Sequence, residues 1–262
     1  MSFLRCILLI VIITLIGSVI VTAQSLGSLE VTGRVKIGTK TEKIKRKRFY
    51  LLPGGLDANK GLIEKIKAAS VTSRDCFYCQ LKASPEYIAW LKVEDCESPY
   101  CREITADDIK AVPEFQAAYQ KGLKQFRGKT DVAQKWVTTN LDPNLRDGYY
   151  RQRKASLDAL LAGIKPLQSS MTDSVSVRAM FIDIGLKSND PEGKATEKFL
   201  ISNLVPIEIG GKGYIWACEK EIGSAKKVIL NLQVPEAGKT IPKCEVIAKD
   251  LPACSGGTCS TK

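Results

Sequence analysis

The stretch that decides the fold class reads Leu29-Glu-Val-Thr-Gly-Arg-Val-Lys-Ile37, in which apolar and polar side chains alternate. Such a period of two predicts a β-strand with one buried face. A polar turn follows at Gly38 to Thr41, and a second extended segment runs from Lys43 to Leu52, where Pro53-Gly-Gly55 stops it. We therefore expect residues 24–55 to form a β-hairpin.

A different pattern begins near Asp57, where apolar residues recur at helical spacing up to about Leu167. Ser84-Pro85 predicts one helix start, because serine is a good N-cap and proline fits the first helical position. Thr105 predicts another, with Asp108 three residues on as a variant of the capping box. The sequence thus predicts a helical insertion of about 110 residues within the region 56–173.

After Ser174 the period returns to two, and several further strands are expected in the region 174–250. Two N-terminal strands cannot bury a core on their own, so they need these C-terminal strands as partners. We predict an α+β fold: an antiparallel β-sandwich built from the N- and C-terminal strands, with the helical insertion between them. A cysteine-containing tail at 251–262 completes the chain.

Three segments of the predicted strands resemble the carboxypeptidase regulatory-like, prealbumin-type β-sandwich module. They are Leu29-Glu-Val-Thr-Gly-Arg-Val, Gly210-Gly-Lys-Gly-Tyr-Ile-Trp and Lys227-Val-Ile-Leu-Asn-Leu. The resemblance covers about a third of the chain, and the helical insertion and the cysteines depart from the family pattern. It implies a non-catalytic accessory or binding module.

Residues 1–23 have the parts of a secretory signal. Arg5 precedes an apolar stretch from Cys6 to Val21, and Val21-Thr22-Ala23 fits a cleavage site that leaves Gln24 as the mature start. The alternative is an uncleaved membrane anchor, because the apolar stretch is nearly long enough to span a bilayer. Either way we expect an extracytoplasmic protein, periplasmic or secreted, which this segment anchors in the membrane if it is not cleaved.

Eight cysteines remain after Cys6, and an even number in an exported chain predicts disulfides. They fall into two groups, residues 76–101 and 218–259, and we expect each group to pair within itself. A zinc site or a thioredoxin-like redox pair is the alternative for the first group, whereas Gln80 excludes a c-type haem. No metal or other cofactor is expected. The candidates are Cys76, Cys79, Cys96, Cys101, Cys218, Cys244, Cys254 and Cys259.

The net charge of +11, or +10 once Arg5 is removed, predicts attraction to anions. In an exported protein the expected partners are an anionic envelope polymer, a membrane surface or an acidic protein, and no nucleic acid is expected. One basic run is concentrated enough to suggest recognition, although lysines also protect edge strands from aggregation. Its residues are Lys43, Lys45, Arg46, Lys47 and Arg48.

The chain contains no histidine, which excludes Ser-His-Asp and Cys-His catalysis within it. Gly122 to Thr130 resembles a phosphate-binding loop, but its glycines are one residue too far apart. Asp183, in an apolar strand, is the carboxylate that a hydrolase could use. A binding platform is the alternative for each of the three tryptophans, but we expect Trp90, Trp136 and Trp216 to anchor cores, and Trp216 to pack against a disulfide.

We therefore predict an exported, non-catalytic binding or scaffold protein with a basic surface and no identified catalytic residue. A carboxylate-based extracytoplasmic hydrolase is the first alternative. A membrane-tethered accessory module with an uncleaved N-terminal anchor is the second. The oligomeric state does not follow from the sequence.

Overall fold

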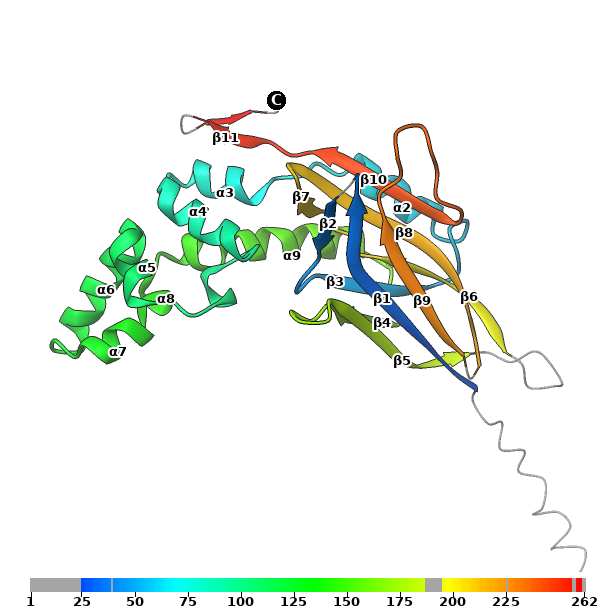
Figure 1. The fold of residues 1–262 in the computed structure, drawn as a ribbon, viewed down its shortest axis with the longest axis horizontal. Helices are drawn as coiled ribbons and strands as arrows, with labels where there is room; N and C mark the ends of the chain where they lie inside the picture. Colours follow the sequence, from blue (N-terminus) through cyan, green and yellow to red (C-terminus); the bar gives the residue numbers. More distant parts are fainter. Residues whose placement is uncertain (1–24, 39, 187–194, 225, 256–257, 261–262) are drawn as a thin grey trace, which may run out of the picture.

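A computed structural model of the chain describes residues 25–38, 40–186, 195–224, 226–255 and 258–260. These residues form a mixed α+β fold, with two main β-sheets and a group of helices to one side of them (Figure 1). The strands are β1 (Ser25–Ile37), β2 (Lys40–Lys43), β3 (Arg48–Pro53), β4 (Gln168–Met171), β5 (Arg178–Leu186), β6 (Thr196–Ser202), β7 (Ile207–Ile209), β8 (Lys212–Gly223), β9 (Lys227–Gln233), β10 (Cys244–Asp250), β11 (Ala253–Ser255) and β12 (Thr258–Ser260). The helical elements are α2 (Lys60–Ala68), α3 (Arg74–Gln80), α4 (Pro85–Val93), η1 (Pro99–Cys101), α5 (Ala106–Ala111), α6 (Pro113–Gln125), α7 (Thr130–Lys135), α8 (Val137–Asn140), η2 (Asn144–Gly148) and α9 (Tyr149–Leu160).

The first sheet is built around β1, the strand of the alternating stretch. β5 and β2 pair with β1 in antiparallel fashion, whereas β9 pairs with it in parallel. The expectation of purely antiparallel pairing is therefore wrong for β9. The chain crosses from the second sheet to the first between β8 and β9. Because β9 follows β8 and is not joined to β1 by a hairpin, it need not run antiparallel to β1. Alternation along a strand does not encode that direction.

The second sheet has the strand order β10-β8-β6-β3-β4, with β7 also paired to β8, and its pairs are antiparallel. The assignment of all residues 24–55 to one hairpin is corrected here, because only β1 and β2 form it. Ile44 is buried in the core and its N–H donates to the Gly33 carbonyl over 2.7 Å. A Cβ on Gly33 would lie 2.9 Å from the Ile44 oxygen, so glycine permits this close approach. The chain then leaves the first sheet, and β3 joins the second.

The largest apolar core lies between the two sheets. Leu29 and Val31 of β1 and Phe49 and Leu51 of β3 are fully buried in it. In β1 these residues alternate with more polar neighbours, as the period of two predicts, whereas in β3 the next residue, Leu52, is also buried, in a different core. Burial of each side chain contributes about 1.5 to 3 kcal/mol. Trp216 of β8 is also buried there, and its indole N–H donates to the Gln233 carbonyl over 2.7 Å. The two sheets are therefore held together by shared apolar burial.

The helices divide between two smaller cores. Leu62, Ile63 and Ile66 of α2, with Leu160 of α9, pack against residues of β3, β6 and β8 on the second sheet. Helices α3 to α8 have their own core, which includes Tyr78, Tyr87 and Phe115, and they form a lobe beside the sheets (Figure 1). We call α3 to α8, with η1 and η2, the helical lobe. The predicted boundary at residue 173 is late, because the helices end at Leu160 and β4 already begins at Gln168.

The C-terminal tail is part of the folded structure. Its strands β11 and β12 form a hairpin that contacts α3, which brings Cys259 to Cys76 and Cys254 to Cys79. Two further bridges lie within the predicted groups, and every cysteine of the described residues is bonded. The expectation that pairing stays within each group is wrong for the first two bridges. The bridges are Cys76–Cys259, Cys79–Cys254, Cys96–Cys101 and Cys218–Cys244.

The two groups pair with each other because the cysteines of α3 and those of the C-terminal hairpin are positioned to face one another. Cys76 and Cys79 are three residues apart and share one face of α3. Cys254 and Cys259 lie directly opposite each other across β11 and β12. Multiple disulfides are typical of proteins in an oxidising, extracytoplasmic compartment. The predicted signal at 1–23 lies outside the described residues, and among those residues no helix is long and apolar enough to cross a membrane.

Candidate functional site

Most cations of the basic run predicted for anion binding form ion pairs with acidic residues of the same chain. Residues Ile44 to Lys47 are not in a strand, so the predicted extended segment from Lys43 to Leu52 is interrupted at the basic run. Lys45 and Arg46 each lie 3.8 Å from a Glu94 oxygen. Lys43 and Arg48 are exposed, and within the described part of the chain neither has an acidic partner. Of five candidates, these two are available to a ligand.

Lys47 is buried at the junction between the sheets and the helical lobe. Its side chain is 6% exposed, and its ammonium lies 2.7 Å from Asp95 and 3.2 Å from Glu97. Arg153 of α9 also contacts Glu97. Burial alone would raise the pKa of the Glu97 carboxyl, but the charges and hydrogen bonds of Arg153 and Lys47 outweigh it and lower that pKa. The junction is therefore a structural ion network.

This network predicts that acid loosens the junction. A carboxyl whose pKa is lowered by folding stabilises the protein above its unfolded pKa, about 4.3, and the stabilisation is lost as the pH falls through the folded value. We expect Glu97→Gln to lower the free energy of unfolding by about 2 kcal/mol at neutral pH, and the difference from wild type to shrink below about pH 4. Urea unfolding at several pH values measures both. Glu64→Gln, at an exposed pair with Lys67, is the control; an E97Q deficit that stays constant with pH would contradict the assignment.

A second buried cation, Arg74 at the start of α3, makes its side-chain contacts within the lobe, and its backbone N–H bonds to β7. Its guanidinium lies 3.1 Å from Asp95 and donates to the Cys96 carbonyl over 3.2 Å. Its backbone N–H donates to Glu208 of β7 over 2.7 Å, and the Tyr149 hydroxyl donates to the same carboxylate over 3.0 Å. Burial, reinforced by the negative charge of Glu208, raises the pKa of Tyr149 well above its ordinary value. Tyr149 therefore stays protonated as a donor.

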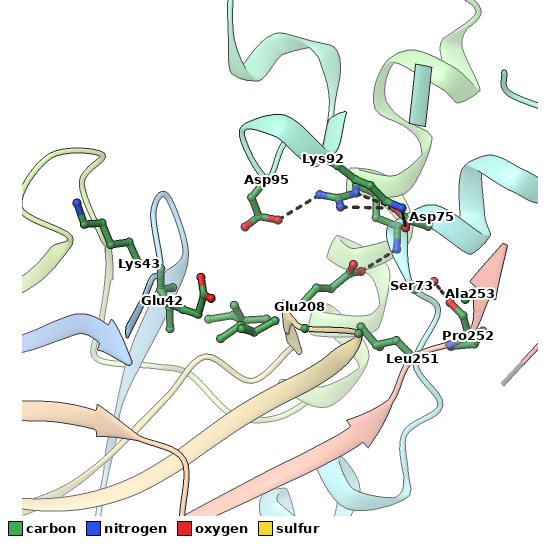
Figure 2. Close-up of a pocket in the computed structure, with 16 residues that line it drawn as sticks. Glu42, Lys43, Ser73, Asp75, Lys92, Asp95, Glu208, Leu251, Pro252 and Ala253 are labelled. Atoms are coloured by element: carbon green, nitrogen blue, oxygen red, sulfur yellow. Dashed lines mark hydrogen bonds and ion pairs between the residues drawn. The ribbon is translucent and has the colours of Figure 1, made fainter. Parts of the chain in front are cut away.

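A pocket of about 450 Å³ opens beside this contact, between β2, β7, the helical lobe and the chain before β11. Asp95, Glu208 and Glu42 are among the residues that line it (Figure 2). Asp95 is already paired with Lys47 and Arg74, and Asp75 with Lys92 and Arg74. Glu208 accepts hydrogen bonds from neutral groups instead. Glu208 and Glu42 are therefore the lining carboxylates that have no ion pair among the described residues.

The remaining predicted site features lie elsewhere. Asp183 is exposed in an irregular part of β5, with a φ of +52°, and it does not line the pocket. Across the described ranges, no group of three or more cysteine and carboxylate side chains is arranged to hold a metal ion. Trp216 is buried in the same core as Cys218, as expected, and Trp90 is buried in the helical lobe. Trp136 is 44% exposed, so its prediction as a core anchor is wrong.

The feature that sequence reasoning missed is a basic corner where α6 turns into α7. We call residues 121–136 the basic corner, and it lies at the end of the helical lobe farthest from the sheets (Figure 1). Its cations are exposed, and no ion pair to any of them occurs among the residues that the structure describes. They are Lys121, Lys124, Arg127, Lys129 and Lys135.

A tight turn brings the two halves of the corner together. Arg127 and Gly128 both have positive φ, of 52° and 80°, and the Gly128 N–H donates to the Leu123 carbonyl over 2.8 Å. Phe126 and Trp136 meet there, with their ring centroids 5.6 Å apart. This is the segment that resembles a phosphate loop in sequence. Its charge is visible in the sequence, but the cations are spaced along α6, the turn and α7 and do not form a consecutive basic run.

Comparison with known proteins leaves the family open. No family model, no curated protein and no solved structure matches the chain significantly.

Proposed function

We propose that this protein is an exported, non-catalytic binding or scaffold protein that holds an anionic partner through the basic corner. The observation that supports this most directly is the charge of the corner. Five exposed cations without an acidic partner, counted over the described ranges, stand within fifteen residues of chain, and Asp131 is the one acidic residue among them. Unpaired surface cations at this density attract anions over a distance of about one Debye length.

The architecture supports a scaffold role. We infer that the two sheets, joined by their common core, form a β-sandwich, and that the helical lobe is an insertion that presents the corner to a partner. Two disulfides, the ion pairs of Lys47 with Asp95 and Glu97, and the hydrogen bond from the Arg74 backbone N–H to Glu208 connect that lobe to the rest of the chain. A rigid connection lowers the entropy lost on binding. The resemblance of β1, β8 and β9 to carboxypeptidase regulatory-like modules agrees with an accessory role.

The test is salt-dependent binding to a soluble polyphosphate. Wild-type protein is expected to bind at low salt and to lose more than about tenfold in affinity at physiological ionic strength, because binding releases counterions. A corner variant, Lys124→Gln with Arg127→Gln and Lys129→Gln, is expected to lose most of the affinity. A matched variant removes three exposed cations from the β1–β2 hairpin, Arg34→Gln, Lys36→Gln and Lys40→Gln, and is expected to lose little. Equal losses in the two variants would show that net charge and not the corner binds.

The pocket supports a second candidate function, a carboxylate-based hydrolase. The observation in its favour is that Asp95 and Glu208, from different elements, line the same cavity (Figure 2). A hydrolase of this kind needs one carboxylate that exchanges protons, and Glu208 is the candidate. Assays with a panel of glycoside and ester substrates test this, with Glu208→Gln as the variant expected to abolish turnover. Activity that survives in E208Q would reject this role for the pocket.

A further inference from the structure

We propose that the basic corner docks on the surface of an anionic lipid bilayer, with Trp136 entering the headgroup layer. This inference rests on the proposed function and names the class of its partner. Among anionic partners, a bilayer offers both a sheet of negative charge and an apolar layer directly beneath it. The corner has a matching pair of features, cations and an exposed aromatic side chain.

The charge of the corner suits an anionic membrane surface. Lys124, Arg127 and Lys129 flank the turn between α6 and α7, and each is exposed. A lysine or arginine close to an anionic membrane raises the partition coefficient about fivefold. Three such residues together correspond to about a hundredfold. Acidic side chains would cancel this, and within the described residues none is paired to these cations.

The aromatic pair distinguishes a bilayer from a soluble polyanion. Trp136 is 44% exposed, whereas Trp90 and Trp216 are 5% and 0% exposed. Exposure of a large indole ring to water is unfavourable, and tryptophan is enriched at membrane interfaces because its ring is apolar and its N–H is polar. Phe126 packs beside it at 5.6 Å between centroids and supports it from the turn. Binding to a hydrated anionic polymer depends on charge and does not require an exposed aromatic pair such as Phe126 and Trp136.

The position of the corner allows it to reach a flat surface. Figure 1 shows the turn between α6 and α7 at the extremity of the helical lobe, away from both sheets. The Phe126 and Gly128 N–H groups donate to carbonyls in the last turns of α6 over 2.8 Å, so these backbone groups are already satisfied. The turn can therefore approach a headgroup layer without these backbone groups losing hydrogen bonds. Contact at an extremity also avoids a clash between the sheets and the membrane.

The experiment uses the intrinsic fluorescence of Trp136, the exposed tryptophan of the three. Wild-type protein is mixed with vesicles of phosphatidylcholine alone, or of phosphatidylcholine with phosphatidylglycerol. We expect a blue shift of the emission and protection from acrylamide quenching with the anionic vesicles alone. We expect the corner variant, K124Q with R127Q and K129Q, to bind these vesicles about a hundredfold more weakly by co-sedimentation. The hairpin variant, R34Q with K36Q and K40Q, is expected to stay close to wild type.

The variant Trp136→Phe, which leaves the net charge unchanged, distinguishes binding to a bilayer from binding to other anionic partners. By co-sedimentation it is expected to bind anionic vesicles severalfold more weakly and to bind polyphosphate as wild type does. Polyphosphate binding without vesicle binding would overturn the bilayer inference and leave the proposed function standing. Binding to neither probe would overturn both. Vesicle binding that is equal in the corner and hairpin variants, or that leaves the Trp136 emission unshifted, would also reject the corner as the docking surface.

Discussion

Removal of both disulfides between α3 and the C-terminal hairpin is expected to lower the free energy of unfolding by about 8 kcal/mol, whereas removal of either one costs about 2.5 kcal/mol. The bridges Cys76–Cys259 and Cys79–Cys254 span sequence separations of 183 and 175 residues. While one bridge is present, the other closes only the short loop through residues 76–79 and 254–259. The last bridge to be removed therefore releases the long loop and most of the chain entropy.

Urea unfolding of three variants measures this coupling. One has Cys76→Ala with Cys259→Ala, the second has Cys79→Ala with Cys254→Ala, and the third combines all four, so that no bridge partner is left as a free thiol. The Cys96–Cys101 bridge spans 5 residues and serves as a local control, with an expected loss of about 2 kcal/mol. Should the fourfold variant not fold, the two paired variants still test the small individual losses. If removal of either bridge alone lowered the free energy of unfolding by about 5 kcal/mol or more, this account of the coupled loops would be wrong.

Lys47→Met is expected to destabilise the protein by about 3 kcal/mol and to leave polyphosphate binding unchanged. The side chain is buried between Asp95 and Glu97, so its loss leaves the two carboxylates at the junction short of a counter-charge. Removal of one partner of a buried ion pair is strongly destabilising for this reason. The same burial keeps Lys47 away from any external anion.

Chemical unfolding and polyphosphate binding, measured on one preparation, check both halves of this prediction. Arg48→Gln is the matched control, because Arg48 is exposed and donates to Ser169 over 3.0 Å. We expect it to change the free energy of unfolding by less than about 0.5 kcal/mol. If K47M instead kept its stability and lost affinity for polyphosphate, the basic run and not the corner would be the recognition surface.

Several parts of the fold follow from local sequence patterns. Alternation in Leu29 to Ile37 predicts β1 and its buried face, since side chains of a strand point to opposite sides by geometry. Ser84 and Thr105 cap α4 and α5 as predicted, and the reciprocal bonds of Thr105 and Asp108 complete the capping box. These signals depend on residues a few positions apart, so they can be seen without the tertiary structure.

The candidate sites follow from the sequence much less well. Lys47 looks like a surface cation in a basic run, but Asp95 and Glu97, about fifty residues later, turn it into a buried structural ion. The pocket gathers Glu42, Asp95 and Glu208 from three distant segments, and no local pattern relates them. Trp136 gives no sign of its exposure, because a lone aromatic residue near helical apolar positions resembles a core residue.

By itself the sequence determined the alternating strands, the helical block between them, the net positive charge, the absence of histidine and a cysteine content typical of export. Each is a property of composition or of short spacing. Only the tertiary structure decided that β3 leaves the first sheet, that β9 runs parallel to β1, that the tail cysteines bond to α3 and that five exposed cations gather around the α6–α7 turn. The physical reason is that partner choice depends on which apolar surfaces are buried together, and burial joins residues that are far apart in the chain.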